Sequence, residues 1–251
     1  VGGFLNPDQF AFSWVFAFTF FYTLIVGSFF WTLLHHAANA GWSVVVRRQL
    51  ENVASLFPYL ILFFIPIIFL AKHLYHWMDV EANQHDPLWI SKRAFLNDGF
   101  FWLRTVIYFT FFTFATWLMK NLSTRQDATK DPHLSVKMRH ISFGFIPLFA
   151  FSLTFSAFDW LMSLDFHWFS TMWGVYLFAG AVWSSMALLI LIVTALKSQG
   201  HLKVVSLEHY HIMGKLLFAF TVFWAYIGFS QYFLIWYANI PEETVYFKHR
   251  V

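Results

Sequence analysis

The chain has 251 residues, of which 59% are hydrophobic, 23% are aromatic and only 12% are charged. This composition lies far outside the range of soluble domains and indicates a polytopic membrane protein. The sequence contains no cysteine, which excludes disulfides, thiolate metal sites, iron–sulfur ligation and thioether-linked haem. The formal net charge of +3 is modest and lies in loops, so it favours a membrane topology and argues against nucleic-acid binding.

Six apolar stretches are each long enough to cross a bilayer as a helix, at about 10–35, 52–77, 98–120, 139–164, 169–197 and 210–238. The predicted fold is therefore all-α, a polytopic transmembrane helical bundle with six spans. We interpret residues 1–251 as a single integral-membrane domain and as an incomplete segment of a longer chain, because the sequence begins without Met and stops just after a polar segment.

Local signals refine the spans. Asn52 and Asp98 are the expected start signals of the second and third helices. Three prolines should kink the second and fourth helices without ending them, namely Pro58, Pro66 and Pro147. Gly180 and Ser184 form a small-xxx-small step that should let the fifth helix pack closely.

A short internal similarity links the first and fifth helices. Residues 6–10 lead into the first helix much as residues 164–169 lead into the fifth, four spans later. An even number of spans keeps the two units in the same orientation, which is the arrangement of tandem four-helix bundles.

Basic residues gather in the connections between helices one and two, three and four, and five and six, and at the adjoining helix ends. They are Arg47, Arg48, Lys120, Arg125, Lys130, Lys137, Arg139, Lys197 and Lys203. By the positive-inside rule, we expect these three connections to be cytoplasmic and both ends of the segment to lie on the opposite side.

Arg104 and Asp159 are the ionisable residues best placed to meet inside the membrane. Arg104 lies six residues past Asp98, about 9 Å along the helix axis, and the next helix runs back and brings Asp159 to a comparable depth. A charge in mid-membrane costs about 2.5–3.5 kcal/mol on insertion scales, and pairing lowers that cost. We therefore predict an Arg104–Asp159 ion pair. In the alternative, Arg104 snorkels to the interface and water solvates Asp159.

Two adjacent histidines, His35 and His36, end the first helix, and Arg47 and Arg48 follow in the connection. Neighbouring residues of a helix point about 100° apart, so the histidines are poorly arranged to chelate a metal. One interpretation is a proton relay or a hydrogen-bonded cap. The other is a set of histidines and arginines that anchors the helix end among lipid headgroups.

A second group of ionisable residues opens the sixth helix and comprises Glu208, His209, His211 and Lys215. His211 and Lys215 are one turn apart and share a helix face. His140, at the predicted start of the fourth helix, lies on the same side of the membrane. Together with the histidine pair of the first helix, these residues are candidates for proton uptake from the cytoplasm. A solvated helix start with a capping acid is the alternative.

We expect no haem, cluster, catalytic metal or covalently bound cofactor on this chain. Haem in a helical bundle needs axial His or Met inside the spans, and no histidine lies near a predicted helix centre. His73 and His76 lack a third ligand at matching spacing, which favours an interfacial role for both. The sequence has no nucleophile–base arrangement, phosphate loop or nucleotide-binding motif.

Three segments carry a resemblance to a known family, at residues 41–48 (GWSVVVRR), 158–174 (FDWLMSLDFHWFSTMWG) and 223–244 (FWAYIGFSQYFLIWYANIPEET). On these segments the sequence resembles the NrfD-like membrane subunits of alternative complex III, most closely the ActF type, the second of the two large membrane subunits. The similarity extends over nearly the whole chain, and members of the family have more than six spans. At position 166, where the family favours Pro, this sequence has Phe.

The resemblance implies a subunit of a respiratory quinol:electron-acceptor (cytochrome c) oxidoreductase in the bacterial inner membrane. The implied partners are a paralogous NrfD-like subunit and the haem c and iron–sulfur subunits that carry the electrons, all within the lipid bilayer. The implied small molecule is a quinone or quinol, either menaquinone or ubiquinone. Subunits of this superfamily can bind quinol in a four-helix bundle near the outer face and are thought to offer proton routes.

A quinol site requires a carboxylate or a histidine to accept the hydroxyl proton, beside an apolar slot for the tail. Arg104, Asp159, Asp165 and His167 are the candidates for such a site or for a proton route, with Trp160 beside them. Two other classes remain open. A proton-conducting transporter should show broken helices and polar sites at mid-membrane. In a structural scaffold, substitution of Asp159 or Arg104 would affect assembly alone.

Overall fold

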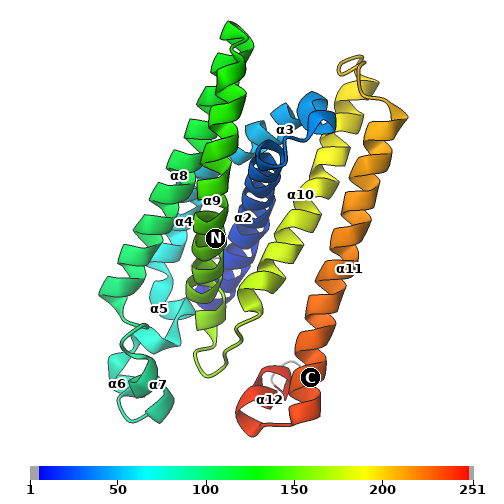
Figure 1. Ribbon diagram of the computed structural model, residues 1–251. Coiled ribbons are helices and arrows are strands. Elements are labelled where there is room, and N and C mark those ends of the chain that lie inside the picture. Colours follow the sequence, from blue (N-terminus) through cyan, green and yellow to red (C-terminus); the bar gives the residue numbers. More distant parts are fainter. Residues whose placement is uncertain (1–5, 249–251) are drawn as a thin grey trace.

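The structure is a computed structural model that describes residues 6–248, and over that part of the chain it is helical, without strands. Six helical segments are long and apolar enough to cross a membrane, as predicted, and Figure 1 shows them side by side. They are Pro7–Ala37, Gly41–Phe69, Asp98–Thr129, Pro132–Leu164, Trp173–Ser198 and Leu207–Ala238. The molecule is thus a polytopic helical membrane protein.

Five of the spans are built on long helices, namely α2 (Pro7–Ala37), α8 (Asp98–Thr129), α9 (Pro132–Trp160), α10 (Trp173–Ser198) and α11 (Leu207–Ala238). The second span comprises η1 (Gly41–Ser43), α3 (Val44–Ala54), η2 (Phe57–Tyr59) and α4 (Leu60–Phe69). The remaining helices are short and are α5 (Ala71–Leu74), η3 (His76–Met78), α6 (Val80–Asn83), α7 (Pro87–Lys92), η4 (Met162–Leu164) and α12 (Pro241–Lys248).

Helix α2 lies at the centre of the molecule and contacts α3, α4, α9 and α10, while α8 packs on α9 and α3. Helix α11 packs mainly on α10, and in Figure 1 it stands at the side of the bundle. Only 11% of the most apolar window of α11 is buried, against 28–44% in the other spans. The spans α2, α3–α4, α8 and α9 therefore form one bundle, to which α10 and α11 add. A tandem arrangement, a single domain over residues 1–251 and the cytoplasmic side of the loops stay predictions.

A tight turn joins α8 to α9 and sets the two helices antiparallel. Asn97 caps α8 by accepting a hydrogen bond from the Phe100 amide at 3.0 Å. Helix α8 ends at Lys130, which has a left-handed conformation with φ 55°, and Asp131 caps α9 by accepting from the His133 amide at 2.9 Å. Because the two helices are antiparallel and pack on each other, residues near the start of α8 and the end of α9 lie at the same level along the bundle.

The second span begins about ten residues earlier than predicted. Asn52 does not start a helix, because a 3-10 turn closed by the Ser43 amide on the Ala40 carbonyl lets α3 begin at Val44. Arg47 and Arg48 therefore lie on a helix instead of in a loop. At the other end the span stops at Phe69, short of the predicted residue 77.

Of the three prolines, Pro66 and Pro147 lie inside α4 and α9, as expected for kinks. Pro58 instead lies in the 3-10 segment that separates α3 from α4. Since proline has no amide hydrogen to donate to the preceding turn, the α-helix is interrupted there, although the span continues.

A close contact between α2 and α10 lies one residue from the predicted small-xxx-small step. Gly27 of α2 contacts Ala181 and Ser185, the residues that directly follow Gly180 and Ser184. A Cβ atom on Gly27 would lie 2.1 Å from the Ala181 carbonyl oxygen. Gly180 instead faces the Trp224 ring of α11 at ordinary contact distance. Positions 180/184 and 181/185 both carry small residues, and they point about 100° apart, so the sequence alone does not select the face that packs.

Candidate functional site

Arg104 and Asp159 form a buried, bidentate ion pair between α8 and α9. Nε of Arg104 donates to Oδ2 of Asp159 at 2.8 Å, and Nη2 donates to Oδ1 at 2.7 Å. The Tyr108 hydroxyl donates to Oδ2 at 2.7 Å. Arg104 is 6% exposed and Asp159 is 0% exposed. The predicted pairing is confirmed, and the snorkelling alternative for Arg104 is wrong.

Arg104 also fixes the chain segment that precedes α8. Its Nη1 donates to the Phe95 carbonyl at 3.1 Å, and its guanidinium lies 3.8 Å from the centre of the Phe95 ring and 4.1 Å from that of Phe100. The Ser163 hydroxyl donates to the Asp159 carbonyl from the other side. The side chain of Asp159 is thus shielded from solvent, and its carboxylate is bonded to Arg104 and Tyr108.

Trp160, the residue that follows Asp159, packs in an aromatic core. Its ring lies 5.5 Å from Phe18, 5.1 Å from Phe64 and 5.4 Å from Phe109, measured between ring centres. Its indole nitrogen donates to the Thr105 hydroxyl at 3.2 Å. This packing explains a large part of the Phe and Trp content as helix-to-helix contact, without implying chemistry.

A cavity of about 330 Å³ adjoins the ion pair on the side of α7. Two of the residues that contact the pair line it, namely Phe95, which contacts Arg104, and Ser163, which contacts Asp159. The other lining residues are Ser91, Lys92, Ala94, Leu96, Phe158, Met162, Phe166, Trp168 and Phe169. The cavity is therefore largely aromatic, and Lys92 supplies its one charged group.

Lys92 lies in the wall of this cavity, and its ammonium is hydrogen-bonded to the main chain of the segment that follows α9. Nζ donates to the Phe166 carbonyl at 2.6 Å and lies 5.3 Å from the centre of the Phe169 ring. Burial lowers the pKa of Lys92, and the nearby Asp165 carboxylate partly opposes that shift. Phe166, which replaces the Pro favoured by the resembled family, is itself buried here.

The two remaining candidates of this region lie farther from the ion pair. Asp165 is partly buried and acts on Lys92 through its charge. His167 is exposed, and its Nε2 lies 2.7 Å from Oδ2 of Asp86, the residue that caps α7. The hydrogen bond from His167 lowers the pKa of the Asp86 carboxyl. The structure thus joins Arg104 with Asp159 and His167 with Asp86, and it places Asp165 near enough to Lys92 for their charges to interact.

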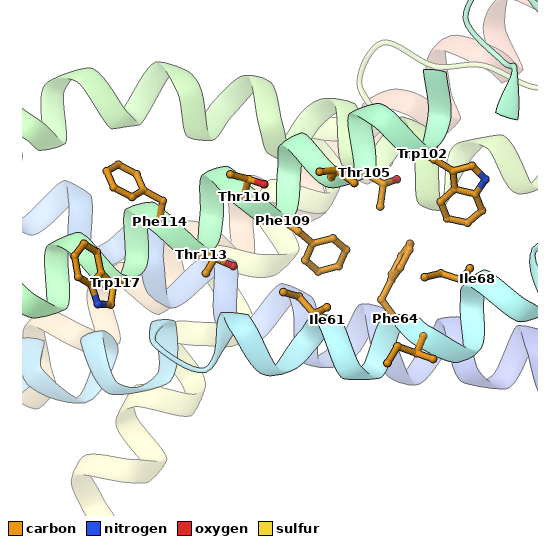
Figure 2. Close-up of a pocket in the computed structure, with 12 residues that line it drawn as sticks. Ile61, Phe64, Ile68, Trp102, Thr105, Phe109, Thr110, Thr113, Phe114 and Trp117 are labelled. Carbon is orange, nitrogen blue, oxygen red and sulfur yellow. The ribbon is translucent and has the colours of Figure 1, made fainter. Parts of the chain in front are cut away.

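A larger groove of about 680 Å³ lies between α4 and α8 and has no lining residue in common with this cavity. Figure 2 shows that its side chains come from these two helices. The lining is apolar apart from three threonines and comprises Ile61, Phe64, Ile65, Ile68, Trp102, Thr105, Val106, Phe109, Thr110, Thr113, Phe114 and Trp117. Many of these side chains are exposed, so the groove opens on the membrane-facing surface.

The opposite end of the bundle contains a buried carboxylate that the sequence interpretation missed. Glu51 of α3 is 3% exposed. Nη1 of Arg48 donates to it at 2.7 Å, Nε of Arg47 lies at 3.5 Å, and the Ser123 hydroxyl is 2.9 and 2.8 Å from its two oxygens. Nε2 of His36 is 3.7 Å from Oε1. The missed signal is the spacing of Glu51 four and three residues after the two arginines, which only a helix starting before Arg47 reveals.

His35 and His36 lie inside the bundle, at 3% and 5% exposure. The ring of His35 packs between Trp31 and Trp42, with ring centres 5.6 and 5.0 Å away. In the part of the chain that the structure describes, neither ring nitrogen of His35 has a hydrogen-bond partner, and nor does Nε2 of His36. The interpretation of the histidines as headgroup anchors is therefore wrong, because both rings are shielded from the interface.

The other proton-uptake candidates are dispersed. His140 lies eight residues inside α9 and not at its start, because Asp131 caps the helix earlier, and its side chain is exposed. His209 accepts from the Ser206 amide at 3.1 Å and so caps α11, while Glu208, His211 and Lys215 are exposed. Among the described residues, no hydrogen bond or ion pair joins these side chains to His35 or His36. This geometry favours the alternative, a solvated and capped helix start.

The structure groups no three His, Cys, Asp or Glu side chains suitable for a metal ion within residues 6–248. His73, one of the two histidines near the end of the second span, lies 2.7 Å from Oδ1 of Asp8. An absence of metal and haem from the protein stays a prediction.

Comparison of the sequence with protein-family models finds no match, and comparison with curated proteins finds none either. The likeness to NrfD-like subunits consequently rests on the three sequence segments alone. One of these segments, residues 158–174, contains Asp159, Asp165 and His167 and forms one wall of the cavity beside the ion pair.

Proposed function

We propose that this chain is an NrfD-like membrane subunit of a respiratory quinol oxidoreductase, related to alternative complex III, and that it shapes a quinol site. The observation that carries the proposal is the aromatic cavity of about 330 Å³ next to the Arg104–Asp159 pair. Flat aromatic walls suit a quinone ring, and one charged group in an apolar pocket can orient a ring hydroxyl or carbonyl.

Quinol oxidation gives up two electrons and two protons, so a site needs proton acceptors as well as an electron acceptor. The electrons would pass to a haem or iron–sulfur centre on a partner subunit, since this chain has no cysteine. The Lys92 ammonium in the cavity wall can donate a hydrogen bond to a ring oxygen of a bound quinol, and burial lowers its pKa. Asp165 and the His167–Asp86 pair lie on the same side and offer acceptors for onward transfer.

In this proposal Arg104 and Asp159 are positioning residues. Their ion pair holds Phe95 through the Arg104–Phe95 hydrogen bond and holds Ser163 through the Asp159 carbonyl. Both held residues line the cavity. The pair would therefore set the distance between the two walls without touching the quinol.

A structural scaffold is the second candidate. It is favoured because the carboxylate of Asp159 is fully hydrogen-bonded within the protein. Both oxygens of Asp159 already accept strong hydrogen bonds, and its side chain is fully buried. Groups so satisfied stabilise helix packing whether or not a ligand binds nearby. A proton-conducting transporter is a third candidate, and the interrupted span at Pro58 is consistent with it.

The test fills the cavity without disturbing the ion pair. Ala94 lines the cavity with an exposed side chain, whereas Ala82 of α6 is exposed at the same end and does not line it. In the intact complex, Ala94→Trp should raise KM for quinol by about ten-fold or more, the effect of losing roughly 1.4 kcal/mol of binding. Ala82→Trp should leave KM unchanged. Equal KM in both variants and in the unaltered complex, with normal assembly, would favour the scaffold.

A further inference from the structure

We infer that the groove between α4 and α8 holds an acyl chain of an anionic phospholipid, whose phosphate binds Lys120. This inference does not depend on the proposed quinol site, because the groove and the cavity have no lining residue in common. It rests on the shape of the groove, on the free hydrogen-bonding capacity of Lys120 and on the charge around it.

The groove has the dimensions of a hydrocarbon chain. Its lining on α8 extends from Trp102 to Trp117, fifteen residues, which is roughly 22 Å at 1.5 Å per residue. The hydrocarbon core of a bilayer is about 30 Å thick, so a groove of this length is short enough to lie inside the core. Figure 2 shows aromatic and branched aliphatic side chains on both sides of the space. Such a recess offers dispersion contacts and almost no polar partner, which suits an alkyl chain.

Lys120 marks the polar end of the groove. It follows Trp117 by three residues, and its Nζ donates to Oδ1 of Asn52 at 2.5 Å and lies 3.3 Å from the Ser55 hydroxyl. Asn52 and Ser55, at the end of α3 and just after it, therefore hold the ammonium where α3 contacts α8, and η2 and α4 follow α3 in the same span. An ammonium has three N–H donors, so one remains for a ligand oxygen.

The charge around Lys120 is complementary to one phosphodiester. Arg47, Arg48 and Lys120 provide three positive charges, and Glu51 and Asp127 provide two negative charges. Arg48 bridges the two carboxylates, which neutralises the arginine side of the cluster. The remaining single positive charge lies at the mouth of the groove and matches a singly charged headgroup such as phosphatidylglycerol. Phosphatidylethanolamine would bring its own ammonium toward Lys120 and Arg48, so it should bind less well.

The test measures retained lipid on the protein in its native assembly. The complex is purified in detergent, supplemented with phosphatidylglycerol or phosphatidylethanolamine of identical chains, and analysed by native mass spectrometry. We expect phosphatidylglycerol to be retained preferentially, and Lys120→Gln to reduce its retention by about five-fold, the effect of one basic side chain at a membrane surface. Lys120→Arg should restore retention, which separates loss of charge from loss of folding.

A second pair of variants tests the groove itself. Val106 and Leu103 are both exposed residues of α8, and only Val106 lines the groove. Val106→Trp should abolish the preferential retention, whereas Leu103→Trp should keep it. The inference is overturned if both headgroups are retained equally, if Lys120→Gln and Val106→Trp leave retention unchanged, or if cross-linking from Val106 captures a partner helix in the groove.

Discussion

Arg104 binds Asp159 through two parallel hydrogen bonds, from Nε and Nη2 to the two carboxylate oxygens, across 55 positions of sequence. The contact joins the first two turns of α8 to the last turn of α9. It satisfies an acid that is completely buried, and it anchors the loop residue Phe95 on the cavity side.

Removing both partners of this pair should cost less than the sum of the two single substitutions. Asp159→Asn or Arg104→Leu leaves the other residue without its buried counter-charge, and we expect a loss of about 3–5 kcal/mol in stability from either change. The double variant should lose less than the sum, because the two residues are coupled. Thermal unfolding in nanodiscs measures the losses, and Tyr108→Phe, which removes one hydrogen bond to a charged group, should cost about 1.5–3 kcal/mol.

The same variants separate the two candidate functions. If Asp159→Asn lowers quinol oxidation, or its linked proton movement, in a complex that still assembles, the pair supports the quinol site. If assembly alone fails, the pair is structural. If both single variants assemble normally and turn over normally across the working pH range, the ion pair is needed neither for the quinol site nor for the scaffold.

The sequence was sufficient to predict the six spans and the Arg104–Asp159 contact, because hydrophobic length and the cost of an isolated charge are properties of the chain and the bilayer. It did not reveal Glu51. Glu51 contacts Arg47 and Arg48 only because α3 begins before them, and the 3-10 turn at Gly41–Ser43 sets that start. The cavity beside Lys92 also escaped prediction, since it forms between segments more than sixty residues apart whose relative position is set by tertiary packing.

A second prediction concerns the close contact of α2 with α10. Gly27→Ala places a Cβ 2.1 Å from the Ala181 carbonyl oxygen, a distance that backbone atoms cannot accommodate without moving the helices apart. We expect a loss of about 1–3 kcal/mol or more, as for overpacking in a core. Gly144→Ala is the matched control, because a Cβ there meets nothing within 4 Å. Equal unfolding temperatures for both variants would show that the contact is looser than described.

A third prediction concerns acid sensitivity of the α7 segment. The His167 hydrogen bond lowers the folded-state pKa of Asp86 below its unfolded value of about 3.9. A depressed carboxyl pKa contributes stability above the unfolded pKa, and this contribution is lost as pH falls through the folded pKa. The protection of the backbone amides within Pro87–Lys92 against hydrogen exchange, taken relative to the intrinsic exchange rate at each pH, should therefore fall in acid. His167→Gln should weaken this pH dependence without removing it, because Asp86 still accepts from the Leu88 amide at 2.8 Å. An unchanged profile in His167→Gln would contradict the prediction.

The last prediction concerns Glu51 and its two arginines. Glu51→Gln keeps the size of the side chain and an acceptor for the Ser123 hydroxyl, but it leaves Arg47 without an acid partner and Arg48 with Asp127 alone. We expect a loss of about 1–3 kcal/mol, the cost of unsatisfied buried hydrogen-bonding groups. Glu208→Gln, on the exposed first turn of α11, should stay within about 0.5 kcal/mol. Unfolding temperatures test this directly. If Glu51→Gln is stable yet abolishes proton-coupled turnover, then Glu51 and its neighbour His36 handle protons and do not merely hold α3 against α8.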